Sequence, residues 1–81
     1  MNWRNNEKIA NILLKYYSYE KLKEMTSEEI YKKIVSLPFF FKCGVTKDNA
    51  LNIEIPLVMY QLRKLTGNIE ETFYVNDSAY I

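Results

Sequence analysis

The strongest local constraint on this 81-residue chain is a helix-start signal at residues 25–30, Met-Thr-Ser-Glu-Glu-Ile. Thr26 in the N-cap position and Glu29 three residues later form a capping box, in which each side chain accepts a hydrogen bond from a backbone N–H of the other residue. Met25 before the box and Ile30 after it can pack together as a hydrophobic staple. The residue before a proline is disfavoured in the helical conformation, so Pro38 ends the segment. We therefore expect a helix over residues 26–37.

The solvent-facing side of this helix carries charges at the spacing of helical neighbours. Glu28 and Lys32 stand four residues apart, as do Glu29 and Lys33. Opposite charges at this separation pair on the surface of one helix, so we expect both pairs to form. The opposite side is expected to bury Ile30, Ile34 and Leu37.

Two more helices are expected. In the first segment apolar residues recur at i, i+3, i+4 and i+7, which predicts an amphipathic helix over residues 5–18. A third helix is expected from Pro56 to Gly67, because proline suits a first helical turn and glycine suits a C-terminal cap. Its predicted buried stripe is Val58, Leu62 and Leu65, and its predicted solvent-facing residues are Tyr60, Gln61, Arg63 and Lys64.

The remaining segments predict β-hairpins. Aromatic residues, turn-forming residues and an apolar–polar alternation predict that residues 39–45 pair with 50–55. A second hairpin is expected from residues 72–75 and 78–81, joined by Asn and Asp. The expected order is α-α-β-β-α-β-β, a single α+β domain over residues 1–81 with two N-terminal helices, a β-hairpin, a third helix and a C-terminal β-hairpin.

The residue counts exclude several classes of chemistry. The chain has no His, one Cys and two Gly. A Ser-His-Asp or Cys-His arrangement, a four-ligand Cys/His zinc site and the glycine-rich nucleotide loops are therefore impossible within one chain. Cys43 is interpreted as a small buried apolar residue or, with Lys42 beside it, as a reactive thiol. We expect a protein that is not an enzyme and uses neither metal nor cofactor.

The cysteine count and the lengths of the apolar runs bear on the compartment. A single Cys cannot form an internal disulfide, which is typical of a small intracellular domain. The longest uncharged stretches, 34–41 and 55–62, are far shorter than the roughly 20 residues that span a bilayer. We expect a cytoplasmic protein with no membrane segment.

Aromatic residues are unusually frequent, at 15% of the chain. Exposed tyrosine is enriched at protein interfaces, and tyrosine between lysines can stack bases. The alternative is that these tyrosines cover the edge of the core with their hydroxyls in water. The C-terminal residues add three acids without a base. The candidate protein-binding residues are Tyr17, Phe40, Glu70, Glu71, Tyr74, Asp77 and Tyr80.

Part of residues 26–81 resembles winged-helix DNA-binding domains. The predicted helix at 26–37 is similar to the helix that precedes their recognition helix, and the segment 55–65 with the following hairpin is similar to the recognition helix and wing. The resemblance implies a dimeric DNA-binding regulator, although about 18 residues separate the two helices where a short turn is usual. In that alternative, the residues that read DNA are Tyr60, Gln61, Arg63 and Lys64.

The chain resembles phage- or mobile-element-encoded inhibitors of host systems, including anti-CRISPR proteins. The resemblance lies in its small size, its abundance of Tyr, Lys, Asn and Ile, and its lack of catalytic machinery. This resemblance implies binding to a larger host protein in the bacterial cytoplasm, where the chain would cover a functional surface. If that partner belongs to a nucleic-acid-binding complex, the acidic C-terminal residues would mimic phosphates. We expect protein binding before DNA binding.

Overall fold

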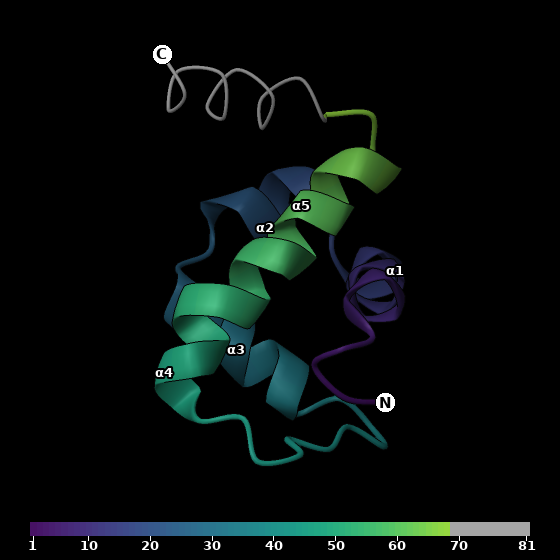
Figure 1. The fold of residues 1–81 in the computed structure, drawn as a ribbon. Helices are drawn as coiled ribbons and strands as arrows, with labels where there is room; N and C mark the ends of the chain where they lie inside the picture. The colour runs from purple at the N-terminus through teal and green to yellow at the C-terminus, as the bar shows by residue number, and fades with distance from the viewer. Residues whose placement is uncertain (69–81) are drawn as a thin grey trace.

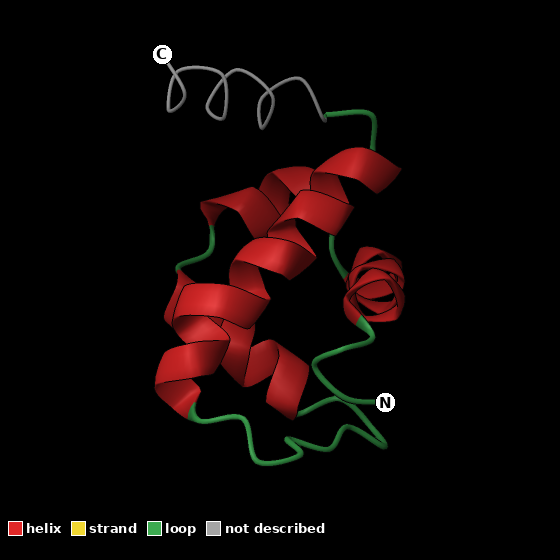
Figure 2. Cartoon of the chain, viewed as in Figure 1, coloured by secondary structure: helices red, strands yellow, loops and turns green. Residues whose placement is uncertain are grey.

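The computed structural model describes residues 1–68, and all the regular structure in this part of the chain is helical (Figure 2). The elements, labelled in Figure 1, are α1 (Asn6–Tyr16), α2 (Tyr19–Glu24), α3 (Ser27–Val35), α4 (Lys47–Asn49), the π-helix η1 (Ala50–Glu54) and α5 (Ile55–Leu65). An isolated bridge between Asn2 and Phe41 is the β-type pairing in these residues. The prediction of an α+β fold is therefore wrong for residues 1–68, and the predicted hairpin of 72–75 with 78–81 lies outside the described residues.

The predicted capping box at the start of α3 is confirmed. The Glu29 N–H donates to Thr26 Oγ1 at 3.1 Å, and the Thr26 N–H donates to Glu29 Oε1 at 3.3 Å. Ile30 and Ile34 are buried as expected. The helix ends at Val35, two residues before the predicted end, in a turn that leads into the proline.

The predicted helix over residues 5–18 is confirmed as α1, and α2 follows it as a separate short helix. The chain leaves the helical conformation at Tyr17 and Ser18, and Ser18 Oγ accepts a hydrogen bond from the Lys21 N–H at 3.2 Å. Serine at an N-cap satisfies one of the free backbone donors at a helix start, so this residue begins α2. Ile9 and Leu13 are buried in α1, which agrees with the predicted periodicity.

The predicted hairpin of 39–45 with 50–55 is wrong. Residues 47–65 form one helical run, α4-η1-α5, which Thr46 starts by accepting a hydrogen bond from the Asn49 N–H at 3.2 Å. The loop before this run has left-handed backbone at Phe39, where φ is 61°, and at Cys43, where φ is 51°. A strand needs negative φ throughout, so these residues cannot pair as predicted.

A π-turn lies in the middle of the helical run and accounts for the proline there. The Ile55 N–H donates to the Ala50 carbonyl, five residues back. Pro56 has no N–H, and its ring would clash with the carbonyl four residues back in a regular α-helix. A wider turn accommodates such a residue, and it also lets Ala50 and Ile55 both face the core although they are five residues apart.

The predicted C-terminal cap at Gly67 is confirmed. Gly67 has a φ of 79°, which glycine adopts without steric cost. The Gly67 N–H donates to the Lys64 carbonyl and the Asn68 N–H donates to the Arg63 carbonyl, which is the pattern of a Schellman motif. The predicted buried stripe is confirmed for Val58 and Leu62 and is wrong for Leu65, which is 40% exposed.

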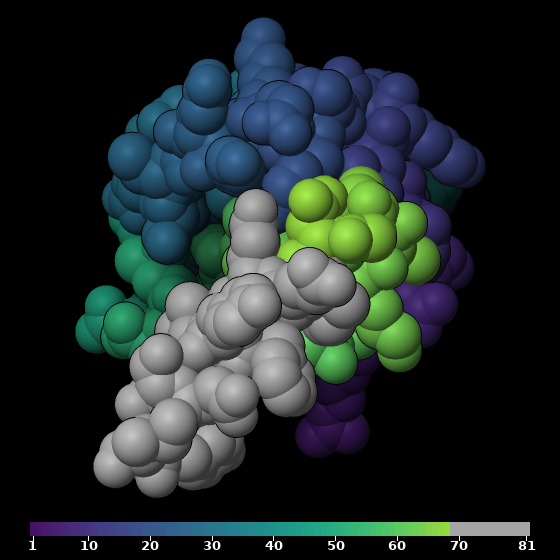
Figure 3. Space-filling view, turned by 90° about the horizontal axis from the view of Figure 1, so that it is seen from above, coloured from purple at the N-terminus to yellow at the C-terminus, as the bar shows by residue number. Residues whose placement is uncertain are grey.

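The core lies between α5 and the N-terminal helices. In Figure 1, α5 crosses in front of α2 and α3, and α1 is seen almost end-on at one side. Seen from above, the C-terminal end of α5 lies against the blue surface of the segment that follows α1 (Figure 3). At the other end of the core Trp3 is 1% exposed, stacks on Tyr31 at 5.9 Å between ring centroids and meets Phe40 edge-on at 4.9 Å.

Candidate functional site

The outward side of the α4-η1-α5 run is apolar. Ile53, Leu57 and Tyr60 are 52%, 45% and 37% exposed, and their spacing of four and three residues places them in one row. The inward side of the same run buries Ile55 and Leu62. A surface helix usually turns polar residues to water, so within residues 1–68 a helix that is apolar on both sides has an unpartnered face. We call Ile53, Leu57 and Tyr60 the outer apolar row.

The four predicted DNA-reading residues, Tyr60, Gln61, Arg63 and Lys64, differ in how far their side chains are exposed. Tyr60 and Lys64 are exposed, whereas Gln61 and Arg63 are half-buried. Gln61 Oε1 is fully buried and has no hydrogen-bond partner within residues 1–68. The structure therefore brings only two of the four side chains fully to the surface.

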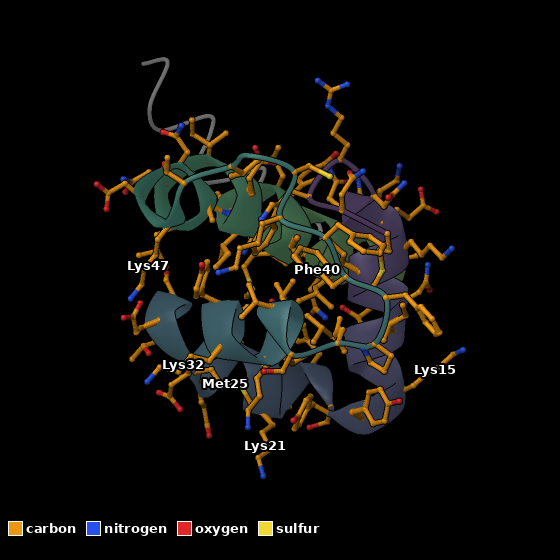
Figure 4. All side chains as sticks on the ribbon, turned by 90° about the horizontal axis from the view of Figure 1, so that it is seen from below. Lys15, Lys21, Met25, Lys32, Phe40 and Lys47 are labelled. Atoms are coloured by element: carbon orange, nitrogen blue, oxygen red, sulfur yellow. The ribbon has the colours of Figure 1, made fainter. Side chains whose placement is uncertain are left out.

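Of the predicted protein-binding residues, two lie in the described part of the chain, and neither is fully exposed. Tyr17 is half-buried, with Lys33 Nζ 5.7 Å from its ring centroid. Phe40 is half-buried against Trp3, and Figure 4 shows it pointing inward. The other predicted residues, Glu70, Glu71, Tyr74, Asp77 and Tyr80, lie outside the described residues.

The neighbours of Phe40 are the aromatic residues that sequence reasoning missed. Phe39 is 83% exposed and Phe41 is 60% exposed. The N-terminal amine donates to the Phe39 carbonyl at 3.1 Å, and the Phe41 N–H donates to the Met1 carbonyl at 2.8 Å, so the backbone of this loop is held in place. A left-handed bulky residue such as Phe39 costs about 1–2 kcal/mol, which the surrounding contacts must offset. The run of three Phe residues was a signal, but it did not show which ring faces inward.

A groove of about 420 Å³ lies between the C-terminal ends of α1 and α3. Its apolar part includes Leu13, Leu37 and Pro38. Tyr16 and Tyr17 also line it, and their ring centroids are 6.5 Å apart. We call it the tyrosine–lysine groove; its lining residues are Leu13, Tyr16, Tyr17, Lys32, Lys33, Ser36, Leu37 and Pro38.

The two lysines of this groove are not paired as predicted. Glu28 instead contacts Lys47 at 2.5 Å, and Glu29 is engaged in the capping box. Among residues 1–68, neither Lys32 nor Lys33 has a carboxylate within 4 Å. The prediction of two ion pairs along α3 is therefore wrong, and no carboxylate in residues 1–68 pairs with the two positive charges of the groove.

A second hollow, of about 670 Å³, lies along the solvent-facing side of α1. Lys8, Asn11 and Lys15 line it at a spacing of three and four residues, which is one side of a helix. Arg4 extends the same lining beyond the start of α1. Glu7 is the carboxylate among its lining residues, so the hollow is basic.

Cys43 is exposed, which corrects the interpretation of a buried thiol. Within residues 1–68, no three His, Cys, Asp or Glu side chains are grouped so that they could hold a metal ion. In the same residues, no helix combines the length and the apolar character that a membrane crossing requires.

Comparisons with known proteins add no identity. The chain matches no protein-family model, and neither the curated proteins nor the solved structures include a detectable match. The surfaces described above therefore carry the functional argument.

Proposed function

We propose that this chain is a non-enzymatic binding protein that covers a functional surface of a larger protein, with the outer apolar row as its principal contact. The single observation that carries the proposal is the exposure of Ile53, Leu57 and Tyr60 along a helix whose opposite side is already buried. Exposed apolar side chains in one row are typical of helices that dock into an apolar groove, where the anchors stand at such spacings.

The chemistry of the row favours protein over duplex DNA as its partner. Lys64 is the exposed cation that continues the row, whereas phosphate contacts require clustered Lys and Arg. We infer a partner surface that is apolar and weakly charged. Size and composition fit a phage- or mobile-element-encoded inhibitor or regulator that acts in the bacterial cytoplasm, which is the setting we propose.

The proposal is tested with a photo-crosslinking amino acid placed at Tyr60 and, as a matched control, at Lys21, an exposed residue of α2 outside both hollows. Expression in a bacterial host should give a discrete crosslinked protein from position 60 that is absent from position 21. The affinity of that purified partner is then measured for wild type and for Leu57→Asp. Loss of an anchor at the centre of an interface typically costs 2 kcal/mol or more, about a 30-fold weakening.

Two results would overturn the proposal. One is a crosslinked partner whose affinity is unchanged by Leu57→Asp while circular dichroism shows an intact helical fold. The other is that the crosslink from position 60 joins two copies of the chain, which sedimentation of the purified protein would confirm as a dimer.

A further inference from the structure

Positive charge collects in the two hollows that α1 helps to line. Among residues 1–68, they are lined together by five cations, Arg4, Lys8, Lys15, Lys32 and Lys33, against the one carboxylate of Glu7. Such an excess selects for an anionic ligand.

Both hollows reach the C-terminal end of α1. Lys15 lines the basic hollow, and the next residue, Tyr16, lines the tyrosine–lysine groove. Figure 4 shows Lys15 projecting outward from this end of α1. Taken together, the two linings extend from Arg4 along α1 to Lys33, and we call them the strip. The helix alone contributes about 16 Å to its length, from 11 residues at 1.5 Å each.

An aromatic platform stands within the strip. Tyr16 is 66% exposed, and its ring is tilted by 55° to that of Tyr17. Lys33 Nζ already lies over the Tyr17 ring, so the platform open to a ligand is Tyr16. Leu13 lines the groove beneath and is fully buried, which makes that part of the groove apolar.

We propose that this strip binds single-stranded nucleic acid, with a base stacked on Tyr16 and the neighbouring phosphates held by Lys15 and Lys33. Exposed aromatic rings combined with a positively charged groove are the usual means by which proteins hold single strands, because every base has a face that can stack. In a duplex the base faces are hidden, and an acidic peptide would use the lysines without the ring. The strip shares no residue with the outer apolar row, so the inference stands independently of the proposed function.

The test is fluorescence anisotropy of the full chain with labelled oligonucleotides of about 12 nucleotides, one of deoxythymidine and one of uridine, compared with a duplex of equal length and an acidic peptide. We expect salt-sensitive binding to one or both single strands. Tyr16→Ala should weaken it about 5-fold to 150-fold, which corresponds to the loss of one stacked base. Tyr16→Phe keeps the ring and should bind as wild type does.

The charge component has its own variants. Lys15→Gln with Lys33→Gln should lower the slope of log affinity against log salt by about 1.4, since each phosphate contact on a single strand contributes about 0.7. The matched control removes the same charge at Lys21 and Lys23, which line neither hollow, and should leave that slope near the wild-type value. Circular dichroism confirms the fold of each variant.

The proposal is overturned if wild type binds neither single strand, if it binds duplex or acidic peptide as tightly as the single strands, or if Tyr16→Ala binds as tightly as Tyr16→Phe. It is also overturned if the Lys21 and Lys23 control loses as much affinity as the Lys15 and Lys33 variant, because binding would then follow net charge alone.

Discussion

Lys47 Nζ donates a hydrogen bond to the Glu28 carboxylate at 2.5 Å and so joins α4 to α3 across 19 residues of sequence. Lys47 Nζ also lies 5.6 Å from the centroid of the Tyr31 ring. The contact holds the start of α4, which follows the loop with Phe39 and Phe41, against the start of α3. Glu28 therefore pairs with Lys47 and not with Lys32.

The pair predicts a loss of stability at alkaline pH. The hydrogen bond to Glu28 raises the pKa of Lys47 above its ordinary value. A group with a raised pKa in the folded state stabilises the fold fully below the ordinary pKa, about 10.4, and this contribution disappears as pH rises through the folded pKa. Urea unfolding between about pH 9 and 11.5 should therefore show a steeper decline for wild type than for Glu28→Gln. Equal declines for the two proteins would show that the pair contributes nothing to the free energy of unfolding.

Replacement of Trp3 should reveal how much the aromatic cluster stabilises the core. Trp3→Ala removes a fully buried ring that contacts Tyr31 and Phe40 and should cost about 3–5 kcal/mol in urea unfolding. Trp3→Phe should cost clearly less, because the Nε1 of Trp3 is buried without a hydrogen-bond partner among the described residues and its loss breaks no bond. Equal costs for the two variants would contradict this explanation.

The capping box of α3 gives a third prediction. Thr26→Ala should destabilise the protein by about 1 kcal/mol, since it removes the acceptor of the Glu29 N–H. Thr26→Ser keeps a hydroxyl and should lie near wild type, and Ser27→Ala is the neighbouring control without a cap. A thermal or urea transition that does not separate Thr26→Ala from Ser27→Ala would rule out the box as a source of stability.

Cys43 should react in the native state. Its side chain is exposed and is the one thiol in the chain. A disulfide reagent such as 5,5′-dithiobis(2-nitrobenzoic acid) should therefore modify one thiol per chain without denaturant, and adding urea should not raise the amount modified. Modification that requires urea would mean that the loop around Cys43 is more closed than described.

The helix caps were predicted correctly, because each depends on residues only a few positions apart. The box at Thr26 and Glu29 and the cap at Gly67 depend only on the backbone within one turn. The alternation over residues 51–55 was misread, since two apolar residues four apart satisfy a helical turn as well as a strand. The decisive signal was Thr46, an N-cap at the start of a helical run. It is one of the turn-forming residues from which the hairpin was predicted.

The candidate surfaces were harder to predict because they depend on contacts distant in sequence. Helical spacing pairs Glu28 with Lys32, yet the tertiary fold supplies Lys47 as a closer partner. Whether a lysine is available to a ligand therefore follows from the fold and not from its neighbours on the helix. The apolar outward face of α5 was likewise not predicted. The periodicity that places Val58 and Leu62 in the core does not show that Leu57 is exposed.

The π-turn between Ala50 and Ile55 also has a consequence for how this helix tolerates changes of length. A π-turn is an α-helix with one residue inserted, so its removal restores the regular register. Deleting one residue among 51–54, together with replacement of Pro56, would leave Ala50 and Ile55 four residues apart and still on the same side. The same deletion after Ile55 would rotate the rest of the helix by about 100° and turn Leu62 away from the core. Length variation within this helical run should therefore be confined to those four positions.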